Sequence, residues 1–221
     1  PQKSDGGVLF RLRGETRPVD GAFLMMCWIA MNGILPADVK LGDTAAVLGM
    51  GTLGIIAALY YQQMGADVIA LEPVAHRAEL AKSMGIRRVL HCQPEEQYEA
   101  VMSATGGRGA DLVVDAAGLS QSIETGIKIA AKYGQVILMG SPRIGALNRR
   151  YPYAEKEGSR LSIQRSLGYI ETLLNQKIID VDRLVSHVIA PTAEALMDAY
   201  EGLMHRKDTY TGVVIDWKKE I

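Results

Sequence analysis

Short runs of consecutive apolar residues, separated by stretches with helical spacing, recur along much of the chain. The apolar runs lie at residues 44–48, 67–71, 88–91, 111–115 and 135–139, and runs of this kind are typical of strands buried on both faces. Segments of helical character lie between them, at residues 52–64, 74–84, 94–104 and 120–132. Strands that alternate with helices in this way predict an α/β fold with a doubly wound parallel sheet.

The remaining segments predict further elements on either side of this pattern. Residues 1–20 show no clear period, and residues 22–34 predict a buried helix. Beyond the fifth apolar run, the sequence predicts helices at 160–176 and 193–204 and strands at 184–189 and 211–217.

Residues 144–147 have the composition of a sixth strand but follow the fifth one too closely. A parallel neighbour needs a crossover of about a dozen residues or more, and only a short stretch separates the two runs. Either residues 144–147 are not a parallel strand, or residues are missing between Arg143 and Ile144. We favour the second interpretation.

Composition excludes several classes of protein. Hydrophobic residues make up 48% of the chain and charged residues 22%, and the formal net charge is −1. This balance is ordinary for a globular domain and gives no reason to expect binding to nucleic acid or to a membrane. The longest apolar run is too short for a membrane helix, and the first residues lack the apolar core of a signal peptide. Two cysteines, Cys27 and Cys92, suggest no disulfide framework, so we expect a cytoplasmic protein.

Three glycines follow the first apolar run and lead into the first helix of the repeating pattern. They are Gly49, Gly51 and Gly54, with Thr52 and Leu53 between the last two. The first glycine permits a tight turn, the second lets a diphosphate approach the backbone, and the third allows close packing of the helix. The free N–H groups and the positive end of the helix dipole then face the anion. The alternative is a tight turn that binds nothing.

An acidic residue, Glu72, ends the second apolar run about 20 residues after the glycines. A carboxylate at this place accepts hydrogen bonds from the hydroxyls of the adenosine ribose and repels the 2′-phosphate of NADP. The pattern therefore favours NAD(H) over NADP(H). Arg77 lies just beyond, where an arginine either binds a phosphate or bonds to the ribose.

These motifs, with several further stretches, resemble the medium-chain dehydrogenase/reductases, the zinc alcohol dehydrogenase superfamily. The stretches are residues 39–54, 106–118, 134–140, 184–189 and 212–216, and the resemblance covers roughly residues 22–217. It implies a Rossmann domain with a partial GroES-like catalytic domain at the termini. The implied divisions are a lead-in at 1–21, the dinucleotide-binding domain at 22–183 and a segment at 184–221 that returns to the catalytic domain.

The resemblance also implies roles for individual residues. Ala117 and Gly118 would line the cofactor groove. Gly140, Ser141 and the backbone at Ala146 would approach the nicotinamide end. In the family, a segment like residues 144–147 forms a sixth strand after a long connection, which agrees with residues missing before Ile144.

The sequence departs from the family at the places where zinc is bound. Nearly all of the N-terminal catalytic domain and the four-cysteine zinc cluster are lacking, and Leu24 or Met25 stands where zinc-dependent members carry a ligand. Cys27 is better explained as a small buried apolar residue than as a zinc ligand. His187 is better explained as a structural residue than as a general base. No metal ligands are identified in this chain, although a full-length parent protein is compatible with zinc.

The function that we expect is hydride transfer between nicotinamide and a carbinol or carbonyl carbon of an alcohol, polyol or sugar derivative. No residue can be named for the catalytic step, and this chain alone is not expected to suffice for activity. The implied partners are a small-molecule substrate and further copies of the chain in a homodimer or homotetramer. The alternatives are a noncatalytic NAD(H)-binding module and an S-adenosylmethionine methyltransferase.

Overall fold

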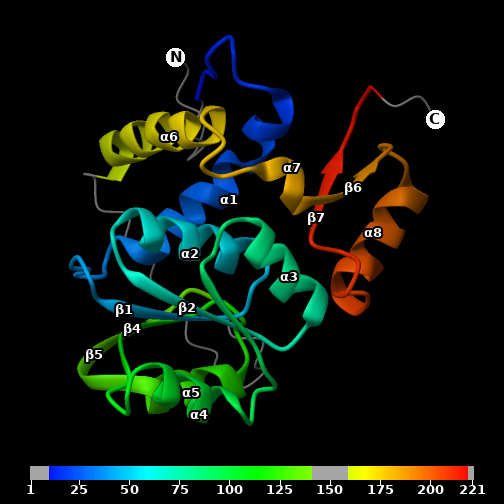
Figure 1. Ribbon diagram of the computed structural model, residues 1–221. Helices are drawn as coiled ribbons and strands as arrows, with labels where there is room; N and C mark the ends of the chain where they lie inside the picture. Colours follow the sequence, from blue (N-terminus) through cyan, green and yellow to red (C-terminus); the bar gives the residue numbers. More distant parts are fainter. Residues whose placement is uncertain (1–9, 141–158, 219–221) are drawn as a thin grey trace.

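A parallel sheet of five strands forms the centre of the computed structural model, which describes residues 10–140 and 159–218 (Figure 1). The strands are β1 (Thr44–Leu48), β2 (Asp67–Glu72), β3 (Arg88–His91), β4 (Ala110–Asp115) and β5 (Ala130–Leu138). Their order is β3-β2-β1-β4-β5, and every neighbouring pair is parallel. The prediction of a doubly wound parallel sheet is confirmed.

Helices cover both faces of this sheet. Figure 1 shows α2 (Thr52–Gln63) and α3 (Ala75–Ser83) on one face, with α4 (Gln97–Ala104) and α5 (Ser120–Ile129) on the other. Beyond α2, the helices α1 (Pro18–Ile34) and α6 (Ser159–Asn175) pack as a further layer. Across residues 10–140 and 159–218, no helix is both long and apolar enough to cross a bilayer.

Two-sided burial explains the apolar runs of the central strands β1, β2 and β4, whereas the outer strands β3 and β5 are only partly buried. All five residues of β1 are buried. Ala45 and Val47 belong to the apolar cluster on the side of α1 and α2, whereas Ala46 and Leu48 belong to the cluster that contains Val101 of α4. Successive side chains of a strand point to opposite faces, so a strand covered on both sides must be apolar at every position.

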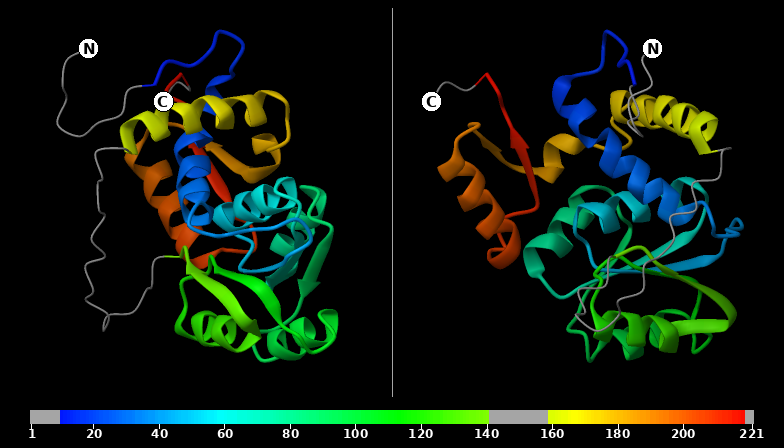
Figure 2. Two further views of the ribbon diagram at one scale, coloured as in Figure 1. Left: turned by 90° about the vertical axis from the view of Figure 1, so that its left-hand side faces the viewer. Right: turned by 180° about the vertical axis from the view of Figure 1, so that it is seen from behind.

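The C-terminal residues form a small lobe beside the main sheet, which Figure 2 shows from two further directions. It consists of α7 (Val181–Leu184), β6 (Val185–Ile189), α8 (Ala193–His205) and β7 (Gly212–Ile215). β6 and β7 pair in parallel as a separate two-stranded sheet. Several hydrogen bonds join the lobe to the main domain. Arg77 Nε donates to the Lys207 carbonyl at 3.2 Å, Thr52 Oγ1 donates to the Thr211 carbonyl at 3.3 Å, and Arg183 of α7 donates to the Ser83 carbonyl of α3.

Several predicted element boundaries need correction. The first helix begins at Pro18 rather than residue 22, because proline suits the first turn of a helix and Arg17 forms a two-pronged ion pair with the buried Asp20. The helix predicted at 94–104 begins at Gln97. Residues 141–158, which include the proposed break and the sixth strand at 144–147, lie outside the described residues.

The end of α5 was also predicted wrongly. The helix stops at Ile129, and residues 130–132, predicted as helical, begin β5. Ala130 has an extended backbone and pairs with Ala110 of β4, and a register shift follows before Leu112. Tyr133, with a φ of 67°, lies in this irregular stretch. Sheet pairing has overridden the helical pattern of these residues.

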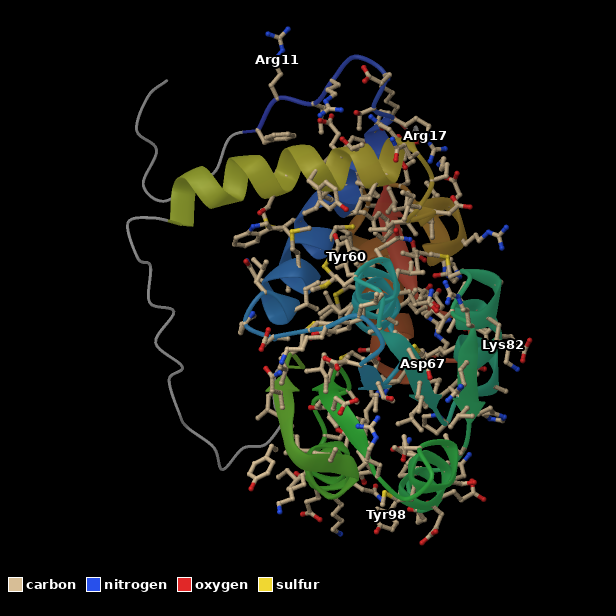
Figure 3. The ribbon with its side chains drawn as sticks, turned by 60° about the vertical axis from the view of Figure 1, so that its left-hand side comes forward. Arg11, Arg17, Tyr60, Asp67, Lys82 and Tyr98 are labelled. Atoms are coloured by element: carbon tan, nitrogen blue, oxygen red, sulfur yellow. The ribbon has the colours of Figure 1, made fainter. Side chains whose placement is uncertain are left out.

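The contact between α1 and α2 buries two ionisable groups. Cys27 has no exposed surface, and the Tyr60 hydroxyl donates to the Cys27 carbonyl at 3.1 Å. Figure 3 shows Tyr60 in the interior of the molecule. Burial raises the pKa of the Cys27 thiol to about 12 and, together with the nearby Cys27, raises the pKa of Tyr60 well above its usual range. Cys27 is therefore the buried apolar residue that the sequence predicted.

The environment of Cys27 predicts that its thiol is inert in the folded protein. With iodoacetamide at pH 8, peptide mass mapping should find Cys27 unmodified in the native state and modified after denaturation, because only an accessible thiolate reacts. Cys92 is only partly buried and provides the internal comparison. Equal labelling of the two cysteines in native protein would contradict this packing of α1 against α2.

Candidate functional site

A cavity of about 350 Å³ lies at the carboxyl ends of β1, β2 and β4. The loops that follow these three strands supply most of its walls, with a few residues from α1, α4 and the C-terminal lobe. Ligands of open α/β sheets bind at this edge, because the connections that leave parallel strands converge there.

The three glycines after β1 have three different structural roles. Gly49 has a φ of 92°, which favours glycine, and its N–H donates to the Leu71 carbonyl at 2.8 Å. A Cβ on Gly54 would lie 1.9 Å from the Gly49 carbonyl oxygen, whereas a Cβ on Gly51 would meet nothing within 4 Å. The turn therefore needs Gly49 and Gly54 for its own geometry, while Gly51 leaves open space on the cavity side.

The N-terminal end of α2 faces this space. Gly51 is the N-cap residue and has no side chain that could cap the helix, and Gly51, Thr52 and Leu53 all line the cavity. The first N–H groups of a helix have no partners within the helix, and the helix dipole places partial positive charge there. This wall of the cavity is suited to an anion.

Glu72 joins the end of β2 to the glycine turn. Its side chain lines the cavity, although the residue is only 2% exposed. One carboxylate oxygen accepts from Met50 N at 2.6 Å, and the other accepts from Val74 N at 2.9 Å. Each oxygen retains acceptor capacity toward the cavity. The sequence predicted an acid facing a sugar here, but it gave no sign that the carboxylate also fixes two backbone turns.

A second buried carboxylate, Asp115, organises the turn after β4. Oδ1 accepts from Ser122 Oγ at 2.7 Å and from Ala117 N at 3.1 Å, and both oxygens lie 3.2 Å from Gly118 N. Gly140 packs directly behind, since a Cβ on Gly140 would lie 2.5 Å from Gly118 N. This role of Asp115 was not predicted, because its only signal in the sequence is an acid at the end of an apolar run.

Most of the predicted cofactor-binding residues lie together on the cavity wall. The wall includes Gly49, Gly51, Thr52, Leu53, Gly54, Glu72, Arg77 and Ala117. Gly118 and Gly140 are not among the lining residues, and they support that wall from behind. Ser141 and Ala146 lie outside the described residues.

The structure adds lining residues that local sequence patterns did not reveal. Met26 comes from α1, Gln97 from α4, and Leu203 and Lys207 from the C-terminal lobe. Their sequence neighbours contain no ligand-binding motif, and only the tertiary fold brings them to the glycine turn. Lys207 and Arg77 give this part of the wall a basic character.

His187, considered from the sequence, and His91 both have partners in the structure. The His187 ring stacks on Tyr210 with ring centroids 3.8 Å apart, and its Nδ1 lies 2.9 Å from Ser186 Oγ. His91 Nε2 lies 3.1 Å from the Pro73 carbonyl oxygen. Neither histidine lines the cavity. In the described part of the chain, no three His, Cys, Asp or Glu side chains are grouped so that they could hold a metal ion.

The sheet order, the glycine turn and the cavity at the carboxyl edge define a Rossmann-type α/β domain. The model of the family described as zinc-binding dehydrogenase matches residues 52–190, which is more than half of the chain. The chain belongs to this family, and the methyltransferase alternative has no support.

Named relatives match part of the chain. An L-threonine 3-dehydrogenase of Caldanaerobacter subterraneus is 35% identical over 114 residues, which cover 51% of this chain and 33% of that protein. The D-guloside 3-dehydrogenase of Escherichia coli is 31% identical over 109 residues, which cover 49% of this chain and 31% of that protein. The chain thus matches about a third of the length of these relatives.

Solved structures share the fold over nearly the whole chain. An alcohol dehydrogenase from Thermus sp. ATN1 superposes with a TM-score of 0.75 at 23% identity, covering 93% of this chain and 62% of that one. A zinc-dependent alcohol dehydrogenase from Streptococcus pneumonia gives a TM-score of 0.77 at 20% identity, covering 97% and 63%. At these identities the likeness establishes the fold.

The tight contact inside the glycine turn predicts a stability difference between two alanine variants. Gly54→Ala should lower the free energy of unfolding by about 1–3 kcal/mol, because its Cβ meets a backbone carbonyl that no rotamer change can move. Gly51→Ala is the matched control, since it has a φ of −74° and open space around the added methyl group. Urea unfolding measures both. A Gly54→Ala variant as stable as Gly51→Ala would contradict this turn geometry.

Proposed function

We propose that the chain is the NAD(H)-binding part of an oxidoreductase that transfers a hydride between nicotinamide and an alcohol, polyol or sugar-type carbinol or carbonyl. The observation that supports this most directly is the open space at Gly51, where a Cβ would meet nothing, beside the N-terminal end of α2. A diphosphate fits this place because the backbone can approach it and the helix end carries partial positive charge.

Glu72 supports the choice of NAD(H) over NADP(H). Its carboxylate is held at the end of β2 with acceptor capacity toward the cavity, which suits two ribose hydroxyls and opposes a 2′-phosphate. In this proposal, Arg77 bonds to the ribose from the basic part of the wall. Ala117 lies along the groove, with Gly118 and Gly140 behind it, and Ser141 and Ala146 are proposed contacts of the nicotinamide end.

The bound nicotinamide ring would supply or accept the hydride, and the residues of this chain would hold and orient the dinucleotide. No residue of the chain is assigned to proton transfer. The relatives named as dehydrogenases of L-threonine and D-guloside support a carbinol substrate. The chain matches only part of each relative, so we propose this activity for the whole protein. A full-length parent protein is compatible with zinc.

The proposal extends to the organisation of the protein. Residues 1–21 and 184–221 would belong with a catalytic domain, and residues 22–183 would form the dinucleotide-binding domain. We propose a cytoplasmic homodimer or homotetramer that acts on a small-molecule substrate.

The Gly51→Ala variant tests cofactor binding directly. We expect NADH titrated into the wild-type chain to bind, and Gly51→Ala to bind at least about tenfold more weakly, because the added methyl group occupies the path of the diphosphate. The melting temperature of the free variant should stay close to wild type. If calorimetry detects no binding of NADH to the wild-type chain, the proposal is overturned.

Removal of the Glu72 charge should change cofactor preference. In Glu72→Gln, the ratio of the NADPH to the NADH dissociation constant should fall by about tenfold, because repulsion of the 2′-phosphate is lost. The ratio is taken within one variant, so a general loosening of the turn affects both constants alike. Arg77→Gln is the comparison and should not lower the ratio. An unchanged ratio in Glu72→Gln would show that Glu72 does not face the ribose.

A further inference from the structure

Ser186, in β6 of the C-terminal lobe, has a side-chain hydroxyl with three hydrogen-bonding neighbours. Its Oγ accepts from Thr211 N at 3.0 Å, donates to the Gly212 carbonyl oxygen at 2.9 Å and lies 2.9 Å from His187 Nδ1. Thr211 precedes β7 and Gly212 is its first residue. The hydroxyl therefore ties β6 to the end of the loop that leads from α8 into β7.

The single proton of this hydroxyl determines which nitrogen of His187 carries a hydrogen. A carbonyl oxygen can only accept, so the hydroxyl proton points to Gly212, and a backbone N–H can only donate, so Thr211 uses one lone pair of Oγ. The other lone pair is left for His187 Nδ1, which must then be the donor. Neutral His187 is thus the tautomer with its hydrogen on Nδ1, and the hydrogen-bonding capacity of the Ser186 hydroxyl is filled.

The His187 ring contacts the same loop a second time, through Tyr210. The two rings stack with centroids 3.8 Å apart and an interplanar angle of 10°. Tyr210 is buried, and it packs so closely on α8 that a Cβ on Gly202 would lie 2.4 Å from its ring. Its hydroxyl donates to Asp198 Oδ2 at 2.9 Å. His187 therefore joins β6 both to the loop and to the helix that precedes it.

The loop that these contacts hold reaches the glycine turn of the main domain. The Thr211 carbonyl accepts from Thr52 Oγ1 at 3.3 Å, and Thr52 is the first residue of α2 and lines the cavity. Lys207 of the same loop also lines the cavity, and its carbonyl accepts from Arg77 at 3.2 Å. The backbone position of residues 207–211 thus determines where this side of the cavity wall lies.

We infer that Ser186 and His187 are positioning residues for the dinucleotide cavity: His187 Nδ1 donates to Ser186 Oγ, and the hydroxyl oriented in this way holds Thr211 where its carbonyl accepts from Thr52. This inference rests on the proposed binding of NAD(H). Neither Ser186 nor His187 lines the cavity, so both act through the backbone of the loop.

Nitrogen chemical shifts test the tautomer directly. In mildly alkaline solution, where histidine is neutral, Nδ1 of His187 should show the shift of a protonated nitrogen and Nε2 that of an unprotonated one. The signals that disappear in His187→Asn assign the ring. The reverse pattern would overturn the inference, and a residue that merely filled space would not require either pattern.

Replacements of His187 separate the donor from the packing. His187→Leu keeps an apolar contact for Tyr210 but has no donor, whereas His187→Asn places an amide N–H close to the position of Nδ1. The NADH dissociation constant should rise about fivefold in His187→Leu and in Ser186→Ala, because a hydrogen bond that fixes the loop is lost. It should stay within about twofold of wild type in His187→Asn.

His205 is the matched control. It lies on α8 of the same lobe, its side chain is exposed, and its Nε2 lies 3.5 Å from Glu201 Oε2. His205→Leu should leave the NADH dissociation constant unchanged. Equal effects of His205→Leu and His187→Leu would overturn the inference.

A double-mutant cycle with Thr52→Val tests the route to the cavity. If Ser186 acts through Thr211 and Thr52, the fivefold effect of Ser186→Ala should largely disappear in the Thr52→Val background, since the supported bond is already absent. An undiminished effect in that background would overturn this route.

The outcomes separate the inference from the proposed function. If wild type does not bind NADH, the proposed function fails and the inference fails with it. If wild type binds NADH and both Ser186→Ala and His187→Leu bind it equally well, only the inference is overturned. Thermal unfolding shows whether each variant is folded. Should Ser186→Ala not fold, the loss in His187→Leu and its rescue in His187→Asn decide the question.

Discussion

The carboxylate of Glu72 joins the two loops on which the cavity depends. Its bonds to Met50 N and Val74 N fix the glycine turn relative to the end of β2, and both bonds involve a charged acceptor that is almost fully buried. Bonds of this kind contribute about 1.5–3 kcal/mol each, and a buried N–H left without a partner costs about 1–3 kcal/mol. The group that would contact a sugar is therefore also the group that shapes the neighbouring phosphate site.

Asp115 repeats this arrangement on the other side of β1. Strands β2 and β4 are the two neighbours of β1, and each ends in a buried carboxylate that accepts from backbone N–H groups of a turn. The floor of the cavity is thus made of backbone that is held by one carboxylate on each side. Backbone can approach a ligand more closely than side chains can, provided that it is held rigidly.

The fold was predictable because the central strands β1, β2 and β4 are buried on both faces, which leaves an unambiguous apolar run for each of these three. The glycine turn was predictable because Gly49 and Gly54 are required by local geometry. The end of α5 was not, since residues 130–132 have a helical pattern and only pairing with β4 makes them a strand. Gln97 and Lys207 were missed because their place on the wall depends on how distant elements pack.

The C-terminal lobe contributes to the cavity as well as to the outer surface. Its loop between α8 and β7 supplies two carbonyl acceptors, one for Arg77 and one for Thr52, and both donors belong to the cavity wall. A rotation of the lobe against the sheet would stretch these two bonds and move Lys207 and Leu203 relative to the rest of the cavity wall. The shape of the cavity therefore depends on the orientation of the C-terminal lobe, which has its own two-stranded sheet.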